Sequence, residues 1–532
     1  MLKSINKWLD KPMRYPAFYY LSIVASIFSY LLSTTLIHLY DTDTYFLIDT
    51  GREIMKNGFL YTNPWSIVEN MGFICQQWLY CVIVAFMHNN FGGFGMFVLI
   101  ASQVTLYCFL AYRFLRLKGI TLGQSCIVIG ALMIIGQSYT INSRPELITI
   151  IILLCLALSL EKYVASGKWY WLLSIPVLNL LEINLHSSMW VFHYAVIVAY
   201  LVPAFYMKGL IVKEPKYKKL PVAITAIASL PVLLINPYGM DGVMYVFMTY
   251  KMHTFRWVDI AELALPDILS GVGIGALIMF TILIVTLVFK CAKSTSVNMV
   301  LGFGLLMLLA IRNNMFLVLA GLYCFRDLFS LPRFQSLSID WKKNLNNGVF
   351  LALLLMDFFF LGLFYNRFVY LDNTEHIEDS VAYAINMNTI TDYLDEYAED
   401  GVSIMTGFNS GAFLEYKGYR NLFIDARPEC YGYLMTGGEY LLAEYSAHCE
   451  YGSYQVVDEH VPNSENYFVT EEDMEAWLAK YNFDYIIVMS GDDSYLQGYM
   501  QACDQYVLAP GSEEIVQQPW MVFERADRVA AK

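Results

Sequence analysis

Charged residues are scarce in this sequence, and they are distributed unevenly. Only 15% of the 532 residues are Asp, Glu, Lys or Arg, whereas 57% are hydrophobic. The first 371 residues carry 17 acids and 27 bases, and the remaining residues carry 30 acids and 7 bases. A basic surplus inside an apolar region and an acidic surplus in a polar tail do not suit a nucleic-acid-binding protein. We therefore expect no nucleic-acid partner.

The sequence also lacks closely paired cysteines and a signal-peptide cleavage site. Its ten cysteines are scattered without a CxxC pair, so they indicate no metal site. In the tail, Cys430, Cys449 and Cys503 could form one disulfide at most. The first apolar run, of about 20 residues, is too long for the core of a signal peptide. We expect it to be a retained first helix.

Long apolar runs are what the sequence has in abundance. Runs long enough to cross a bilayer recur between Ala17 and Tyr365, which is typical of a polytopic membrane protein. We predict eleven spanning helices, at residues 17–38, 94–112, 122–139, 146–161, 169–183, 188–206, 220–236, 270–289, 295–311, 314–330 and 346–366.

The basic residues sort to one side of these predicted helices. Twenty of the 34 Lys and Arg residues fall in segments 1–14, 113–118, 161–168, 207–219, 290–293 and 326–343. The opposite loops before Arg367 hold only six. Because cytoplasmic loops are enriched in Lys and Arg, we predict a cytoplasmic N-terminus and an external tail.

Two parts outside the predicted spans have patterns of their own. We expect loop 39–93 to hold interfacial helices at about 43–57 and 75–89, flanking the turn "NGFLYTNPWS". The tail alternates a helical stretch at 380–399 with the β-rich runs "SIMTGF", "NLFIDAR", "DYIIVMS" and "PWMVFER". This predicts a membrane domain, 1–371, with a structured first external loop, and a small external α/β domain, 372–532.

Asp41 and Asp43 directly follow the first apolar run. A carboxylate at the membrane boundary lies where a lipid headgroup would lie, and partial burial raises its pKa toward that of a useful base. The alternative is an ordinary polar start of a loop. The pair could also hold a divalent cation, and no other cofactor is predicted.

Several cations and one histidine map to the predicted external helix ends. The positive-inside bias disfavours basic residues there, so those that remain need a reason. One reading is a ring that binds a lipid phosphate, and the other is pairing with nearby acids or carbonyls. The candidates are Arg144, His186, Lys251, Arg256 and Arg312.

Three further residues are candidates for an acceptor site. Asp425 and Arg427 lie beside a predicted strand end, where loops often carry binding groups, and the alternative is a mutual salt bridge that stabilises the turn. Trp78 is expected to anchor the second interfacial helix.

The ordered motifs resemble those of bacterial GT-C glycosyltransferases, polytopic enzymes that use polyprenyl-phosphate-linked sugars. "DTDTYFLIDTGREIMKNGFLYTNPWS" and "QQWLYCVIV" are similar to the first external loop of that family, and "SRPEL", "NLHSS", "INPYG" and "AIRNN" to later elements. The matching positions are Asp43, Tyr45, Gly51, Pro64, Ser66, Trp78, Leu79, Arg144, Pro145, Asn184, His186, Asn236, Pro237, Gly239 and Arg312. Leu47 and Asn63 depart from the pattern, which often has His and Asp there. The tail also resembles the external α/β domain of that family.

The resemblance implies an inverting glycosyltransferase in the bacterial plasma membrane, working at its external face. Asp43 would act as the base, with Asp41 as a helper, and the external cations would hold the departing polyprenyl phosphate. The expected partners are a polyprenyl-phosphate-linked sugar, membrane lipids, and a lipid, glycan or protein acceptor of the cell envelope. The alternatives are a transporter or lipid flippase and a non-catalytic envelope scaffold.

Overall fold

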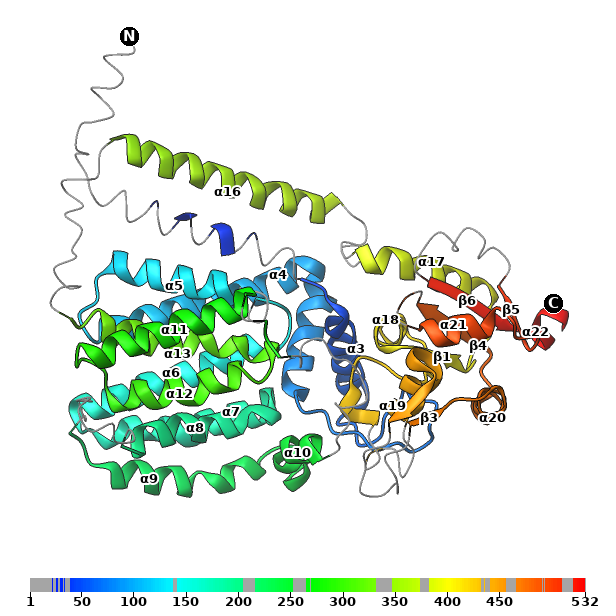
Figure 1. The fold of residues 1–532 in the computed structure, drawn as a ribbon, viewed down its shortest axis with the longest axis horizontal. Coiled ribbons are helices and arrows are strands. Elements are labelled where there is room, and N and C mark those ends of the chain that lie inside the picture. The colour runs from blue at the N-terminus through cyan, green and yellow to red at the C-terminus, as the bar shows by residue number, and fades with distance from the viewer. Residues whose placement is uncertain are drawn as a thin grey trace, which may run out of the picture. The chain divides into compact units, whose positions relative to one another are not determined.

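The computed structural model is mostly helical, with a small sheet in its C-terminal part (Figure 1). Apart from single residues between 22 and 33, it describes residues 39–136, 141–203, 216–251, 265–267, 269–331, 347–373, 382–431, 435, 441–455, 466–489, 491, 493–509 and 520–531. The chain divides into two compact units.

The first unit comprises Met1–Leu39, Gly93–Asn236 and Ala261–Asn373. Helix α13 is its centre, because it packs on α5, α6, α11 and α12, and α8 packs on α6, α9 and α12 (Figure 1). The elements are the second part of α4 (Trp78–Arg116), α5 (Leu122–Gly136), α6 (Glu146–Ser166), η2 (Trp169–Leu173), α7 (Ser174–Leu185), η3 (Ser187–Met189), α8 (Trp190–Leu201), α9 (Lys219–Ala228), η4 (Leu230–Leu234), α11 (Gly271–Val288), α12 (Ser294–Met307), η7 (Ile311–Phe316), α13 (Leu317–Leu328) and α16 (Asn347–Asn373).

The helices lie where the apolar runs predict them, but most are shorter than expected. Ten of the eleven predicted spans contain a described helix, and the first, 17–38, falls largely outside the described residues. Only Trp78–Arg116 and Glu146–Ser166, among the described helices, are long and apolar enough to cross a membrane. Within the other described helices the apolar stretches have 10–17 residues, and at about 1.5 Å per residue such stretches fall short of a 30 Å hydrocarbon core. The prediction of eleven spanning helices is therefore not supported.

Local backbone geometry divides several of the apolar runs. Short 3₁₀ segments precede α7, α8 and α13 and follow α9, so an apolar run is only partly α-helical. Gly92, with φ 55° and ψ −144°, breaks Trp78–Arg116 into two helices. This break agrees with the predicted separation of the interfacial helix from the following span.

The second unit comprises Tyr40–Gly92, Pro237–Ile260 and Thr374–Lys532. A four-stranded sheet has the order β1-β4-β6-β5, with β1 parallel to β4 and the other pairs antiparallel. Helix α21 packs on β4, and α17 and α22 pack on β6. This confirms a small α/β fold in the tail. Its strands are β1 (Ile404–Met405), β2 (Ser453–Gln455), β3 (Asn466–Phe468), β4 (Tyr485–Met489), β5 (Tyr506–Leu508) and β6 (Trp520–Arg525).

The helices of this unit come from the first loop as well as from the tail. They are α3 (Thr42–Asn57), the first part of α4, α10 (Met240–Lys251), α17 (Ala382–Tyr397), α18 (Phe408–Lys417), η9 (Pro428–Tyr431), α19 (Leu441–Tyr445), η10 (Ser446–Tyr451), α20 (Glu471–Tyr481), α21 (Ser494–Met500) and α22 (Ala526–Ala531). Helix α10 was not predicted. Helix α3 packs along α18, so the first loop and the tail share a core.

The first loop also joins the sheet of the tail. Leu422 N donates to Trp65 O at 2.8 Å, and Ile67 N donates to Leu422 O at 2.9 Å. Leu422 in turn bridges Ile404 of β1. In the sequence run "NLFIDAR", only Leu422 bridges the loop and β1. The strand predicted there does not form. The compact unit of the tail includes residues 40–92, which the sequence places with the membrane domain.

Candidate functional site

Asp41 is the N-cap of α3. Its Oδ1 accepts hydrogen bonds from Thr44 N at 2.9 Å and Thr44 Oγ1 at 2.6 Å, and Asp41 N donates to Thr44 Oγ1 at 2.9 Å. This reciprocal capping box satisfies backbone donors that the first turn of a helix leaves without intrahelical partners. Asp41 therefore has a structural role as a helix cap, where the sequence suggested a helper or an ordinary polar start of a loop.

Asp43 lies in the first turn of the same helix, and its side chain is half-buried. An acid there interacts favourably with the positive end of the helix dipole. The neighbouring Thr42 Oγ1 donates to Asn409 Oδ1 of α18 at 3.1 Å. His88 lies between Tyr40 and Tyr416, with Nδ1 2.9 Å from Tyr40 OH and Nε2 3.1 Å from Tyr416 OH. Contacts on both sides thus fix the segment that carries Asp43.

Asp425 and Arg427 are buried, at 1% and 4% exposure. Arg427 Nε donates to Asp425 Oδ1 at 3.0 Å, Nη2 donates to Glu415 Oε2 at 2.7 Å, and Nη1 donates to Thr50 Oγ1 at 3.2 Å. The guanidinium also lies 4.6 Å from the centre of the Trp65 ring. Asp425 and Arg427 therefore form the salt bridge that the sequence offered as the alternative to an acceptor-site role. Arg427 also links α3 to the tail through Thr50.

A second polar group beneath α3 was missed by the sequence analysis. Trp65 is fully buried, and its Nε1 donates to Asp49 Oδ2 at 2.7 Å. Arg420 lies 3.5 Å from both Asp49 Oδ2 and Glu53 Oε2. Burial raises the pKa of Asp49, although Arg420 and Trp65 oppose the increase. The spacing of Asp49 and Glu53, one helical turn apart on an otherwise buried helix, is the sequence signal that could have indicated this group.

The remaining acceptor candidate, Trp78, is half-buried at the first residue of α4. Its ring packs edge-on against Phe59, with centroids 5.0 Å apart. Both residues belong to the second unit, and Phe59 is exposed.

Arg144 and Arg312 belong to the first unit. Arg144 is half-buried in the turn before α6. Arg312, in η7, has a side chain 36% exposed and lies 3.8 Å from Glu146 Oε1 at the start of α6. This loose pair is the helix-end pairing that the sequence offered as the alternative to phosphate binding, yet it leaves much of the guanidinium accessible. The side chain of Lys251 and all of Arg256 lie outside the described residues.

His186 follows α7 and is 3% exposed. Its Nδ1 lies 3.0 Å from Thr149 Oγ1. Burial, reinforced by the nearby charge of Arg312, lowers the pKa of His186 to about 3. The imidazole is therefore neutral at pH 7, which differs from the cationic role that the sequence suggested for it.

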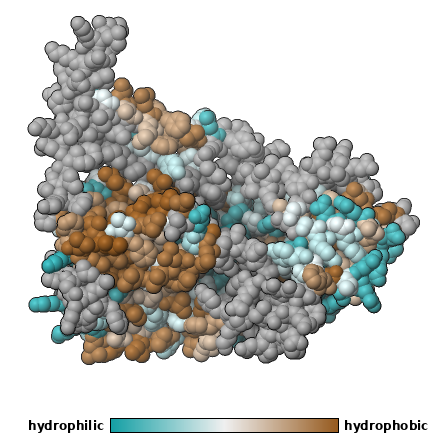
Figure 2. Space-filling model, viewed as in Figure 1, coloured by the Kyte–Doolittle hydropathy of each residue, from teal (hydrophilic) through white to brown (hydrophobic). Residues whose placement is uncertain are grey.

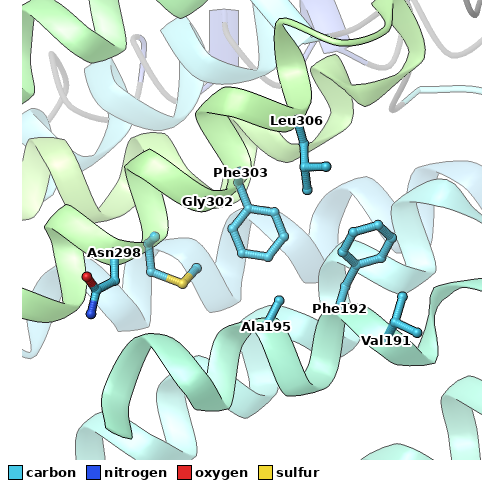
Figure 3. Close-up of a pocket in the computed structure, with 8 residues that line it drawn as sticks. Val191, Phe192, Ala195, Asn298, Gly302, Phe303 and Leu306 are labelled. Carbon is cyan, nitrogen blue, oxygen red and sulfur yellow. The ribbon is translucent and has the colours of Figure 1, made fainter. Parts of the chain in front are cut away.

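An apolar cavity of about 250 Å³ lies between α8 and α12 (Figure 3). Asn298 supplies its one polar side chain, and Asn298 Nδ2 donates to the carbonyl oxygens of Ala199 at 3.1 Å and Val202 at 2.8 Å. The other lining residues are Val191, Phe192, Ala195, Met299, Gly302, Phe303 and Leu306. The cavity offers apolar surface and no reactive group.

No group of three or more His, Cys, Asp or Glu side chains in the described residues is placed to hold a metal ion. Comparison of the sequence with protein-family models and with curated proteins finds no match.

Proposed function

We propose that the chain is a membrane glycosyltransferase of GT-C type. It would move a sugar from a polyprenyl-phosphate donor to an acceptor of the cell envelope, at the external face of a bacterial plasma membrane. The observation that carries the proposal is the location of Asp43, the acid that matches the motif of the resembled family. Asp43 lies in the first turn of α3, and this turn is held in place by the Asp41 cap and by the hydrogen bond of Thr42. A general base must first lie within reach of the proton that it removes, and only then does its pKa affect the rate.

The surface of the first unit supports membrane insertion. Hydrophobic residues cover much of its visible face in Figure 2. Large apolar side chains that are more than half exposed include Ile227 on α9, Ile284 on α11 and Leu305 on α12. Apolar surface of this extent is expected where a protein faces lipid or a partner. The proposal keeps the cytoplasmic N-terminus and the external tail, without the count of eleven spans.

In the proposed reaction, Asp43 takes the proton of an acceptor hydroxyl, whose oxygen attacks the anomeric carbon of the donor sugar. The bond to the phosphate oxygen breaks, and the polyprenyl phosphate leaves with the electron pair. Phosphate binding is proposed for Arg144 and Arg312 of the first unit, because a guanidinium offers a two-pronged donor.

The first experiment measures sugar transfer by purified protein carrying Asp43→Asn. Loss of a general base costs about two to four orders of magnitude in rate, while binding of the donor lipid should be kept. Asp41→Asn is the matched control, because Asn also serves as an N-cap. Near-normal transfer by Asp43→Asn, or a larger loss in Asp41→Asn, would reject Asp43 as the base.

A second experiment tests the phosphate ligands. Arg312→Ala should weaken binding of the donor lipid, and Arg312→Lys should restore part of it, because the charge is kept and the two-pronged geometry is lost. Arg144→Ala and Arg144→Lys form the parallel pair. If both Ala variants fold and bind the donor as the wild type does, these arginines have structural roles only.

One observation favours the alternative of a transporter or lipid flippase. Glu182 and His193 are both fully buried among apolar helices, 3.6 Å apart. Ionisable residues within membrane segments often mark transport pathways. Movement of a labelled polyprenyl-phosphate sugar across vesicles, without release of polyprenyl phosphate, would favour this alternative.

A further inference from the structure

Inside the first unit, a chain of polar side chains runs from Ser229 to His186. The donor and the acceptor of its hydrogen bonds can be assigned one after another, starting at Ser229. Ser229 Oγ donates to the carbonyl oxygen of Ala226 at 2.7 Å. Because this uses the single hydroxyl proton of Ser229, its oxygen can only accept from Asn179, 2.9 Å away. The amide nitrogen of Asn179 therefore faces Ser229, and its Oδ1 faces His193 Nδ1 at 2.8 Å. An amide oxygen only accepts, so His193 carries a proton on Nδ1.

The next link is the fully buried pair of His193 and Glu182. His193 Nε2 lies 3.6 Å from Glu182 Oε2, and both side chains have 0% exposure. Neither atom has a hydrogen-bond partner within the described residues. The other carboxyl oxygen, Oε1, is the acceptor in a hydrogen bond with Thr149.

That acceptor sets the direction of the last two hydrogen bonds. Thr149 Oγ1 lies 2.7 Å from Glu182 Oε1 and must donate to it. Having only one proton, the Thr149 hydroxyl must then accept from His186 Nδ1, 3.0 Å away. His186 therefore has its proton on Nδ1. Since its low pKa leaves it neutral, Nε2 carries a lone pair and can only accept.

We propose that His186 Nε2 accepts a hydrogen bond from a sugar hydroxyl, beside the phosphate contact of Arg312. The assignment rests on the proposed glycosyltransferase function. A neutral acceptor cannot stabilise a phosphate anion, but it matches an O–H group. Arg312 lies close enough for its charge to act on His186. The two side chains together therefore suit a sugar phosphate, with the guanidinium on the phosphate and the imidazole on the sugar.

The hydrogen-bond chain itself is tested without any substrate. The full-length protein is labelled with ¹⁵N-histidine, and His186→Gln identifies the His186 signals by their absence. At pH 7 we expect a protonated Nδ1 and an unprotonated Nε2. Thr149→Val, which removes the hydroxyl but keeps the shape, should lose this preference. A proton on Nε2 of the wild type, alone or with one on Nδ1, would overturn the assignment.

The ligand is tested by exchanging the chemistry at residue 186. In a sugar-transfer assay, His186→Gln keeps an acceptor and should lose no more than about tenfold, the scale of one hydrogen bond. His186→Lys offers only donors and should lose more. Polyprenyl phosphate without a sugar is the binding probe, and the wild type and His186→Gln should bind it equally. Higher transfer by His186→Lys than by His186→Gln would show that the site needs a cation instead.

The two experiments separate the possible failures. A wild-type protein that transfers no sugar would remove the glycosyltransferase function, and the sugar hydroxyl with it. The ¹⁵N measurement would still decide the state of His186. A protonated Nε2 in an active enzyme would remove the hydrogen-bond chain and leave the function standing.

Discussion

Arg427 faces two buried carboxyl groups, and one positive charge cannot neutralise both. Burial raises the pKa of Glu415 well above its usual range, and Arg427 only partly opposes this. Burial also disfavours ionised Asp425, but Arg427 and its hydrogen bonds, with one from Tyr431, lower the pKa of that carboxyl. The cluster is therefore neutral when Asp425 is ionised and Glu415 is protonated.

This distribution of protons predicts unequal effects of two similar substitutions. Asp425→Asn leaves a buried guanidinium without its counter-charge and should cost about 3–5 kcal/mol in the free energy of unfolding. Glu415→Gln replaces a protonated acid by an amide of the same shape and should cost far less. Denaturant titration of both variants at pH 7 checks the difference. Equal losses would contradict the assignment of the protons.

The same cluster predicts a dependence on pH. Above pH 4.5, the usual pKa of Glu, the unfolded chain releases the proton of Glu415 while the folded chain keeps it. Because the folded state then binds more protons, the contribution of this residue to stability falls as the pH rises. Glu415→Gln should remove that part of the slope between pH 5 and pH 8. Parallel stability curves for the wild type and the variant would reject this prediction.

At the scale of elements, α3 and the first part of α4 approach each other at Gly51. A Cβ atom on Gly51 would lie 2.1 Å from the carbonyl oxygen of Cys81, a backbone atom that cannot turn aside. Gly51 is thus required for close packing of these two helices beneath the segment that carries Asp43.

Gly51→Ala should therefore lower the free energy of unfolding by about 1–3 kcal/mol or more, as overpacking does elsewhere. Gly498→Ala, in α21 of the same unit, is the control, because a Cβ there meets no atom within 4 Å. Ala is favoured over Gly inside a helix, so this control should be neutral or stabilising by up to about 1 kcal/mol. Thermal unfolding compares the two, and similar effects would show that the close approach is not limiting.

At the scale of the whole molecule, the first loop and the tail fold as one unit. In the proposed topology they lie on the same side of the membrane, and the charge sorting of the sequence predicts that this side is external.

Impermeant thiol labelling in intact cells tests both statements. Lys56→Cys in the loop and Ser494→Cys in the tail replace exposed residues and should both be labelled. Lys216→Cys, in a predicted cytoplasmic segment, should be labelled only after lysis. Cys503 is replaced in the background, because it is less buried than the other four cysteines of the second unit. Labelling of Lys56→Cys and Ser494→Cys from opposite sides would contradict the shared unit, and labelling of both only after lysis would reverse the topology.

The sequence by itself determined features that depend on neighbouring residues. Apolar runs located ten described helices, and the interfacial helix predicted at about 43–57 agrees with α3, which Asp41 caps. The α/β character of the tail followed from local alternation. These predictions hold because helix capping and hydrophobic periodicity act over a few residues.

Tertiary structure alone decided what distant segments do together. Arg427 and Thr50 are 377 positions apart, yet they bond across the core of the second unit. The strand-like pairing of Leu422 with Trp65 has no local signal either. His186 is a basic residue type in the sequence, and it is burial, with a neighbouring arginine, that makes it neutral. Burial and long-range pairing arise only when the chain closes on itself, so composition and spacing cannot fix the charge state of a buried group.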